Sequence, residues 1–363
     1  MSRFDSERLS ALEPYTPGEQ PKDRKFIKLN TNESPYPPCK EALALASVEA
    51  ARLNLYSDPE SRELTEAVAK RYGLKYENVL MTNGSDEILN FAFMAFSDKN
   101  KPIVFPDITY GFYPVFANLN GIPYETIPLE EDFSIDYKKL CACNKNIVIA
   151  NPNAPTGILM PLNEIEEIVR TNPNNIVIID EAYIDFASKC KGLEIQPESA
   201  VNLISKYDNL IVTQTFSKSR SLAGARLGFG MANSDLIASL NAIKYSTNPY
   251  NVNRMTAAAG LESIKHDDYY MENCKRIIDT REFTTKELLK EGFKVIPSSA
   301  NFIFIKADFI SGKELYSELY NAGILVRHFE TERLKSYNRV TIGSREEMEA
   351  FLREIKRIKQ KES

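Results

Sequence analysis

The sequence predicts an α/β fold: a large domain with a mostly parallel sheet flanked by helices, and a smaller α+β domain. Two observations support this fold class. Between residues 79 and 231, short apolar runs alternate with helical patterns, as in parallel sheets that carry helices on both faces. From about residue 252, a long helical region is followed by short strands and two further helices.

With 363 residues, the chain is long enough for two domains with buried cores. We expect residues 1–47 to form an N-terminal arm and part of the small domain, 48–255 the large domain, and 256–363 the small C-terminal domain. Prolines recur in the arm and predict an extended rather than a helical chain: Pro14, Pro17, Pro21, Pro35, Pro37 and Pro38. The arm is either a surface linker or a segment that lies across a site or a partner subunit.

The first predicted helix follows Tyr56. Leu64, Val68 and Tyr72 recur at helical spacing, and Gly73 ends the pattern. We therefore expect an amphipathic helix with a tyrosine just before its start.

A predicted strand over 79–81 leads through the turn 82–87 into an apolar helix over 88–96. Gly84 and Ser85 stand where this helix begins. Free backbone N–H groups and the positive end of the helix dipole suit a phosphate at such a position. The alternative is that Ser85 is only an N-cap.

Two further strands end in distinctive loops. The strand 103–105 leads to Tyr110, which either stacks on an aromatic ligand or packs in the core. The strand 147–150 leads to the loop 151–157, where two prolines and a glycine restrict the backbone around Asn153. A helix over 162–170 follows.

The strands 176–179 and 210–212 place two charged residues at one edge of the predicted sheet. Asp180 directly follows four β-branched residues, and an ionised carboxylate there is costly unless a cation meets it. Lys218 lies among hydroxyl and small residues, and a lysine amine attacks carbonyl groups where burial or a neighbouring cation lowers its pKa. A lysine in a loop is more often a solvated surface charge, so this interpretation depends on its neighbours.

The remaining elements belong to the smaller domain. We expect helices over 252–291, 312–321 and 345–357, and strands near 295 and over 302–306, 324–327 and 339–342. This irregular order of strands and helices indicates an α+β unit.

Composition and charge argue against several classes of protein. A net charge of −5 without a basic block gives no reason to expect nucleic acid as a partner, and we find no apolar run long enough to cross a membrane. The opening residues lack the apolar core of a signal peptide, so we expect a cytoplasmic protein. The sequence has an odd and scattered set of cysteines: Cys39, Cys141, Cys143, Cys190 and Cys274. Such a set suits a reducing compartment better than a disulfide framework.

Neither a zinc site nor a serine hydrolase is expected. The two histidines, His266 and His328, lie far in sequence from the pair Cys141 and Cys143. Neither histidine neighbours a recognisable nucleophile elbow. We therefore assign no metal ligands.

Four strand-end loops together offer the parts of a pyridoxal phosphate site. Lys218 supplies an amine that can bond to the cofactor, and Asp180 a carboxylate that keeps the pyridine nitrogen protonated. Asn153 is a candidate donor to the ring oxygen, and Gly84 and Ser85 offer a helix N-terminus to the phosphate.

With these residues, the sequence resembles the fold-type I aminotransferases, and within them the histidinol-phosphate aminotransferases. The resemblance covers nearly the whole chain, from residue 15 to 347, with specific motifs at 29–33, 82–87, 151–157, 180–183 and 215–228. It implies a homodimeric, pyridoxal phosphate-dependent enzyme of histidine biosynthesis. Such an enzyme converts histidinol phosphate and 2-oxoglutarate into imidazole acetol phosphate and glutamate.

The resemblance implies a role for each matching residue at the cofactor. Lys218 would form the Schiff base and act as general acid and base, and Asp180 would pair with the pyridine nitrogen. Tyr183 would hydrogen-bond the ring oxygen, and Tyr110 would stack on the ring. The residues expected to hold the phosphate are Gly84, Ser85, Asp86, Ser217 and Arg226.

The resemblance also extends to the partner subunit and the substrate. Tyr56 would reach the phosphate of the cofactor in the neighbouring subunit, so that the two subunits share sites. The residues expected to bind the substrate, with Arg339 at its anionic end, are Arg339, Arg327, Tyr15 and Asn32. One position departs from the family: Ala154 stands where an asparagine usually precedes Pro-Thr-Gly, so Asn153 is the candidate replacement.

Other activities of the same fold remain alternatives. Threonine-phosphate decarboxylases and aromatic amino acid aminotransferases use similar cofactor loops. A cofactor-sensing regulator is disfavoured, because the arm is too short and not basic enough for a DNA-binding module.

Overall fold

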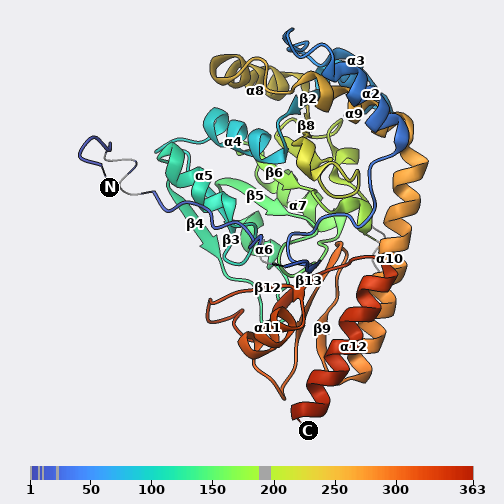
Figure 1. Cartoon of the computed structure of the whole chain (residues 1–363). Coiled ribbons are helices and arrows are strands. Elements are labelled where there is room, and N and C mark those ends of the chain that lie inside the picture. Colours follow the sequence, from blue (N-terminus) through green and yellow to red (C-terminus); the bar gives the residue numbers. More distant parts are fainter. Residues whose placement is uncertain (1, 7–8, 10–11, 22–23, 188–197, 363) are drawn as a thin grey trace.

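The larger part of the molecule is built on a seven-stranded sheet with strand order β2-β8-β7-β6-β5-β3-β4 (Figure 1). The strands are β2 (Val79–Thr82), β3 (Ile103–Pro106), β4 (Tyr124–Ile127), β5 (Asn146–Ala150), β6 (Val177–Asp180), β7 (Leu210–Thr215) and β8 (Gly228–Ala232). β8 is antiparallel to its two neighbours, and the other pairs are parallel, which confirms the predicted fold class. The computed structural model describes residues 2–6, 9, 12–21, 24–187 and 198–362.

Both faces of this sheet are buried, because consecutive residues of a strand point to opposite sides. In β5, Ile147 and Ile149 belong to the core on one face, and Val148 belongs to the core on the other. This accounts for the continuous apolar runs of the sequence. The helices that pack on the two faces include α3 (Arg62–Arg71), α4 (Ser85–Phe96), α5 (Phe112–Asn120), α6 (Tyr137–Cys141), α7 (Leu162–Thr171) and α8 (Ser234–Thr247).

The smaller part contains a four-stranded antiparallel sheet with strand order β12-β13-β10-β9. Its elements are β9 (Lys294–Ile296), β10 (Phe302–Lys306), β12 (Arg327–His328), β13 (Asn338–Thr341), α11 (Gly312–Asn321) and α12 (Arg345–Glu362). The long helix α10 (Asp267–Lys290) runs along one side and connects the two parts (Figure 1). The arm joins the smaller part through β1 (Ile27–Lys28), which pairs in parallel with β11 (Ile324–Leu325).

Two elements predicted as continuous are divided in the structure. The predicted strand 324–327 becomes β11 and β12, which pair with different strands, β1 and β13. The predicted helical region 252–291 becomes α9 (Arg254–Lys265) and α10, which meet at His266. Residues 40–50, for which we predicted no element, form α2 (Lys40–Ala50), and this helix packs against α9.

The two hydrophobic cores divide at a later position in the chain than residue 255. Ala259 and Leu261 of α9 share a core with Leu64 of α3, whereas Cys274 of α10 belongs to the core of the smaller part. Tyr270 still belongs to the first core. The division between the two hydrophobic cores therefore falls within α10.

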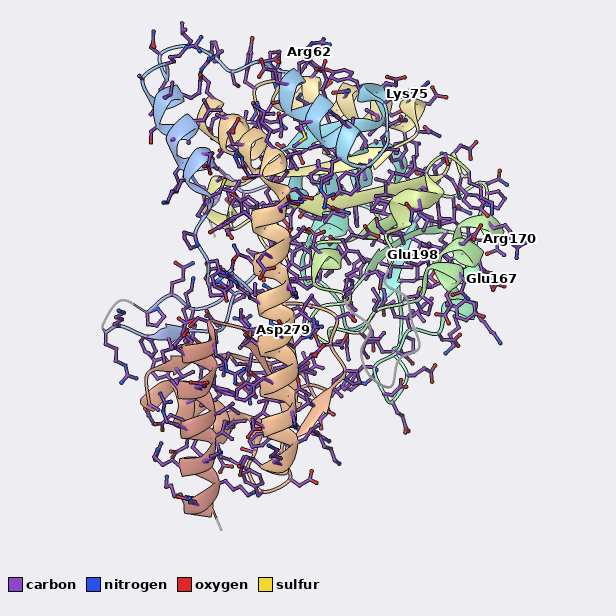
Figure 2. All side chains as sticks on the ribbon, turned by 90° about the vertical axis from the view of Figure 1, so that its right-hand side faces the viewer. Arg62, Lys75, Glu167, Arg170, Glu198 and Asp279 are labelled. Carbon is purple, nitrogen blue, oxygen red and sulfur yellow. The ribbon has the colours of Figure 1, made fainter. Side chains whose placement is uncertain are left out.

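The described surface carries charges of both signs. Figure 2 shows cationic and acidic side chains on several elements of one face: Arg62, Lys75, Arg170, Glu167, Glu198 and Asp279. No helix among the described residues is long and apolar enough to span a membrane. Cys39, Cys141, Cys143 and Cys274 are free thiols, and Cys190 lies outside the described residues.

Candidate active site

Two adjoining cavities lie where β5, β6 and β7 end. The inner cavity, of about 380 Å³, is lined by residues that include Ser85, Asp86, Asp180, Ser217 and Arg226. The outer cavity, of about 770 Å³, is lined by residues that include Tyr15, Asn32, Arg327 and Arg339. Both cavities are lined by Lys218, Tyr110 and Tyr183. Open α/β sheets bind ligands at the carboxyl ends of their strands, and here the strand ends bring most of the predicted site residues together.

Lys218 stands where the two cavities meet. Its Nζ donates a hydrogen bond to the carbonyl oxygen of Thr31 (3.2 Å) and lies 5.9 Å from the centre of the Tyr183 ring. Burial, and secondarily the guanidinium of Arg339, lowers the pKa of Lys218 to about 8. With such a pKa, about a tenth of the amine is neutral at pH 7, far more than for an exposed lysine. A nucleophile or general base requires this neutral form.

Asp180 is buried at the end of β6 and has one hydrogen-bonded oxygen. The hydroxyl of Tyr113 donates to Oδ2 (2.9 Å), whereas Oδ1 has no hydrogen-bond partner within the described part of the chain. Burial raises the pKa of Asp180 to about 7, and the hydrogen bond from Tyr113 opposes this shift. A buried carboxylate oxygen without a donor, in the wall of a cavity, fits a ligand that carries a protonated nitrogen.

The first turn of α4 and the loop after β7 form a cradle for an anion. Gly84 has a φ of 79°, and a Cβ on it would lie 2.6 Å from Nη2 of Arg226. A Cβ on Gly228 would lie 2.4 Å from the backbone nitrogen of Ser85. The two glycines thus allow Arg226 and the helix N-terminus to approach closely, and the N–H groups of that first turn suit a phosphate. Asp86 holds the guanidinium in place, because its Oδ2 lies 2.9 Å from Nη2 of Arg226.

Hydrogen bonds hold the two tyrosines that line both cavities. The Tyr183 hydroxyl accepts a hydrogen bond from Nδ2 of Asn32 (3.0 Å). The Thr341 hydroxyl holds Asn32 in turn, because it accepts from the Asn32 backbone N–H and donates to Oδ1 of the Asn32 side chain. The Tyr110 hydroxyl donates to Asp86 (2.7 Å). Burial raises the pKa of both tyrosines, so their hydroxyls stay protonated at neutral pH.

Arg327 and Arg339 are paired across β12 and β13, and both line the outer cavity. Nη2 of Arg339 donates to the carbonyl oxygen of Asn30 (2.9 Å), but its buried Nε has no partner among the residues that the structure describes. The Arg327 guanidinium donates long hydrogen bonds, of 3.4 Å each, to the carbonyl oxygens of Thr16 and Pro17. Two guanidinium groups with spare donors offer a site for a carboxylate or a phosphate.

Asn153 lies close to the site, but its amide is already engaged. It accepts a hydrogen bond from Thr109 (2.8 Å) and donates to the carbonyl oxygen of Ile108 (3.0 Å) and to Thr156 (3.2 Å). Ala154 lines both cavities, whereas Asn153 is not among their lining residues. The structure therefore does not support the expected contact between Asn153 and a ring oxygen, because this amide holds its own loop together.

Other residues of the site were not expected from the sequence. Tyr113 lies in the first turn of α5, three positions after Tyr110, and the centroids of the two rings are 5.7 Å apart. Thr31 and Glu33 line the inner cavity; they belong to the motif 29–33, but no role at the site was assigned to them. Tyr56, in contrast, is 79% exposed and does not line either cavity.

The chain is similar to known proteins over nearly its whole length. The family model described as aminotransferase class I and II matches residues 24–355. A histidinol-phosphate aminotransferase of Brachyspira hyodysenteriae is 49% identical over 99% of both chains, and one of Clostridium acetobutylicum is 47% identical over 98% of this chain and 99% of its own. The structure of a histidinol-phosphate aminotransferase from Sinorhizobium meliloti, in complex with pyridoxal 5′-phosphate, has a TM-score of 0.89 at 22% identity and covers 100% of this chain and 99% of its own. At that identity, the structural likeness shows the fold.

Proposed function

Because this chain belongs to the class I and II aminotransferases, we propose that it transfers the amino group of histidinol phosphate to 2-oxoglutarate. The products are imidazole acetol phosphate and glutamate, as in histidine biosynthesis. The observation that carries the proposal is the pair Arg327 and Arg339 in the cavity that Lys218 also lines. One substrate brings a phosphate and the other a carboxylate, and a guanidinium binds either group. The names of the relatives at 49% and 47% identity point to the same substrate.

The enzymes of this family use pyridoxal phosphate, and the inner cavity has the groups to hold it. The α4 turn at Gly84 and Ser85, with Arg226, would hold the phosphate, and Oδ1 of Asp180 would meet the ring nitrogen. Lys218 would bond to the aldehyde carbon. When bound, the cofactor supplies an electron-withdrawing ring that stabilises the negative charge left on the substrate Cα after proton loss.

The side chains of the site have distinct tasks in this reaction. Once the substrate amine has displaced it from the aldehyde carbon, Lys218 would take the proton from the substrate Cα on Nζ, a task for which its lowered pKa suits it. Ionisation of the Asp180 carboxyl group costs free energy while the group is buried without a charged partner. A cation beside Oδ1 favours the ionised form. Asn32 holds the Tyr183 hydroxyl in position at the junction of the two cavities.

Removal of each arginine should affect the two half-reactions differently. Arg339→Ala should slow the reactions of both glutamate and histidinol phosphate by about 10- to 100-fold, because charged hydrogen bonds of about 1.5–3 kcal/mol are lost. Arg327→Ala should weaken the histidinol phosphate reaction more than the glutamate reaction, since the more highly charged phosphate benefits more from a second cation. Single-turnover absorbance of the cofactor with each donor measures both effects.

Arg333→Ala is the matched control. Arg333 lines the same cavity but is committed to Asp107 (3.2 Å) and to backbone carbonyl oxygens. Equal losses for both donors in Arg327→Ala would contradict the division of roles. Faster turnover of phenylalanine by the wild type, or release of carbon dioxide from threonine phosphate, would contradict the substrate itself.

We further propose a cytoplasmic homodimer with shared sites. Exposed apolar side chains lie on α2 and α8 and in the loops beside them: Leu43, Val48, Leu53, Leu55, Tyr56, Tyr245 and Tyr250. Figure 1 places α2 and α8 at the same end of the molecule, and Tyr56 stacks on Tyr250 with ring centroids 4.5 Å apart. Apolar patches of this kind mark protein interfaces. The free thiols are typical of a reducing compartment.

A mixed dimer tests whether Tyr56 acts in the neighbouring subunit. Mixing Lys218→Ala subunits with Tyr56→Ala subunits should raise activity above the mean of the two parent proteins. One site of the mixed dimer then combines an intact Lys218 with an intact Tyr56 from the other subunit. Tyr56→Ala alone should bind the cofactor about tenfold more weakly, for the loss of one hydrogen bond to a charged group. Substitution of Tyr124, on the edge strand β4, is the control. The proposal of shared sites would be contradicted if the mixed dimer showed no recovery of activity. A fully active monomer in sedimentation would also contradict it.

A further inference from the structure

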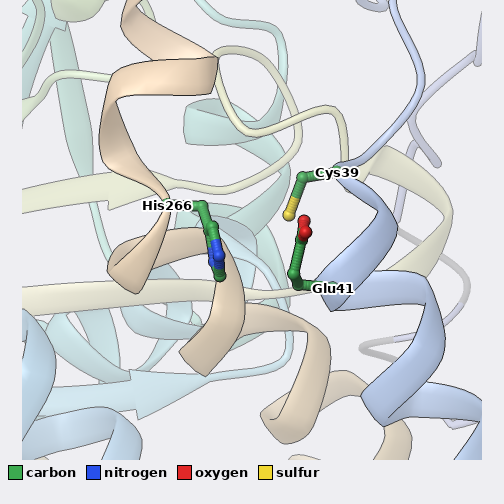
Figure 3. Close-up of side chains that lie close together, drawn as sticks. All are labelled: Cys39, Glu41 and His266. Carbon is green, nitrogen blue, oxygen red and sulfur yellow. The ribbon is translucent and has the colours of Figure 1, made fainter.

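A cysteine, a glutamate and a histidine converge at the start of α2 and the junction of α9 with α10 (Figure 3). One ligand atom each of Cys39, Glu41 and His266 lies within 4.8 Å of those of the other two. We propose that these three side chains bind a divalent transition-metal ion, with zinc as the best match. The site lies outside the two cavities described above, because none of the three residues lines them.

The types of donor atom select the class of ion. A thiolate, an imidazole nitrogen and a carboxylate oxygen are all ligands of zinc, which commonly takes four of them in tetrahedral geometry. Calcium and magnesium prefer oxygen ligands throughout, so the sulfur of Cys39 disfavours them. Three protein ligands leave the fourth position to water.

The hydrogen bond of His266 prepares its ring for this task. Nδ1 lies 3.0 Å from the backbone carbonyl oxygen of Glu262. A carbonyl oxygen can only accept, so Nδ1 carries the proton in the neutral ring and Nε2 keeps its lone pair. Metal-bound histidines characteristically donate their other ring N–H to a carbonyl or carboxylate in this way.

The two ligands of α2 are also in a suitable state. Cys39 is a buried free thiol at the N-cap of α2. Its backbone N–H donates to the hydroxyl of Tyr270 (3.0 Å), which ties the cysteine to α10. Glu41 is exposed in the first turn, and its carboxylate has no hydrogen bond or ion pair with any described residue.

A bound ion would link the start of α2 to the start of α10, the helix that leads into the smaller part. The extended chain before α2 supplies Thr31 and Asn32 to the active site. Any ion that binds the folded chain and not the unfolded one raises stability by mass action. We therefore expect zinc to raise the thermal midpoint without acting at the reacting atoms.

Metal binding to the chelator-treated holoenzyme tests this site. Zinc should bind with a stoichiometry of about one ion per subunit, and cobalt in its place should show the near-ultraviolet charge-transfer absorption of a thiolate ligand. Cys39→Ser, His266→Gln and Glu41→Gln should each weaken zinc binding by at least about tenfold and remove the rise in thermal midpoint. Glu41 is exposed, so Glu41→Gln separates loss of the ligand from loss of the fold.

The controls are His328→Gln and Cys141→Ser, which change the second histidine and a distant thiol. Both proteins should bind zinc as the wild type does. The proposal is overturned if the wild type binds no stoichiometric zinc, or if the three ligand variants bind it unchanged. It is also overturned if cobalt shows no thiolate band, or if the control substitutions are the ones that abolish binding.

Discussion

Lys218→Ala should abolish transamination, with a loss of at least about 10³-fold in each half-reaction. A positioned proton transfer alone contributes about 10²- to 10⁴-fold, and this variant also loses the amine that bonds to the cofactor. The structure offers a specific reason for choosing this lysine: its amine lies where the two cavities meet, and burial lowers its pKa to about 8. Single-turnover kinetics, together with borohydride reduction and peptide mass spectrometry, measure the loss and locate the bond.

Two variants separate the chemistry of this amine from its charge. Lys218→Arg keeps a cation but not a nucleophile, so it should be as inactive as the alanine variant. Lys206→Ala removes an exposed lysine paired with Glu166 and should leave the reaction unchanged. A reducible bond to cofactor at any other lysine of the Lys218→Ala protein would disprove the assignment.

Asp180→Asn should retain the cofactor yet lose activity by about 10²-fold or more. An amide cannot hold a proton on the ring nitrogen by charge, and the interaction of an opposite charge at close range is worth one to three pKa units. The structure supports this expectation, because Oδ1 of Asp180 is buried and has no donor in the described residues. Absorbance of the bound cofactor and kcat for glutamate are the measurements, and activity within about tenfold of wild type, or ~1.4 kcal/mol, would count against the role.

Glu181→Gln is the matched control for this variant. Glu181 is the next residue and is also buried with a raised pKa of about 7, but it accepts hydrogen bonds from Ser199, Ala200 and Gln214 instead of facing the cavity. Its amide variant should keep activity within about tenfold of wild type. If both substitutions cost the same, burial of a carboxylate in this region, rather than its contact with the cofactor, would explain the loss.

Local sequence pattern was sufficient to predict most of the large domain and the centre of the site. Apolar runs such as 147–150 and 176–179 predicted strands buried on both faces, and the parallel sheet confirms them. Parallel strands present their carboxyl ends at one edge, so the positions directly after those runs were expected to meet. Asp180 and Lys218 do line the same inner cavity.

Contacts between distant segments were decided only by the tertiary structure. Arg327 and Arg339 became neighbours through the pairing of β12 with β13, and that pairing divided a strand that the apolar pattern predicts as continuous. Asn153 was the candidate replacement for the asparagine that the family has at the position of Ala154, yet its amide is engaged by its own loop. Cys39 and His266 gave no metal-binding spacing in sequence, because α2 and α10 approach only when the core around Tyr270 forms. The spacing of apolar residues and the residue types of a turn depend on neighbours along the chain, so the sequence pattern shows them directly. Contacts between distant segments depend instead on how separately formed helices and strands pack against each other, and neither segment specifies that packing alone.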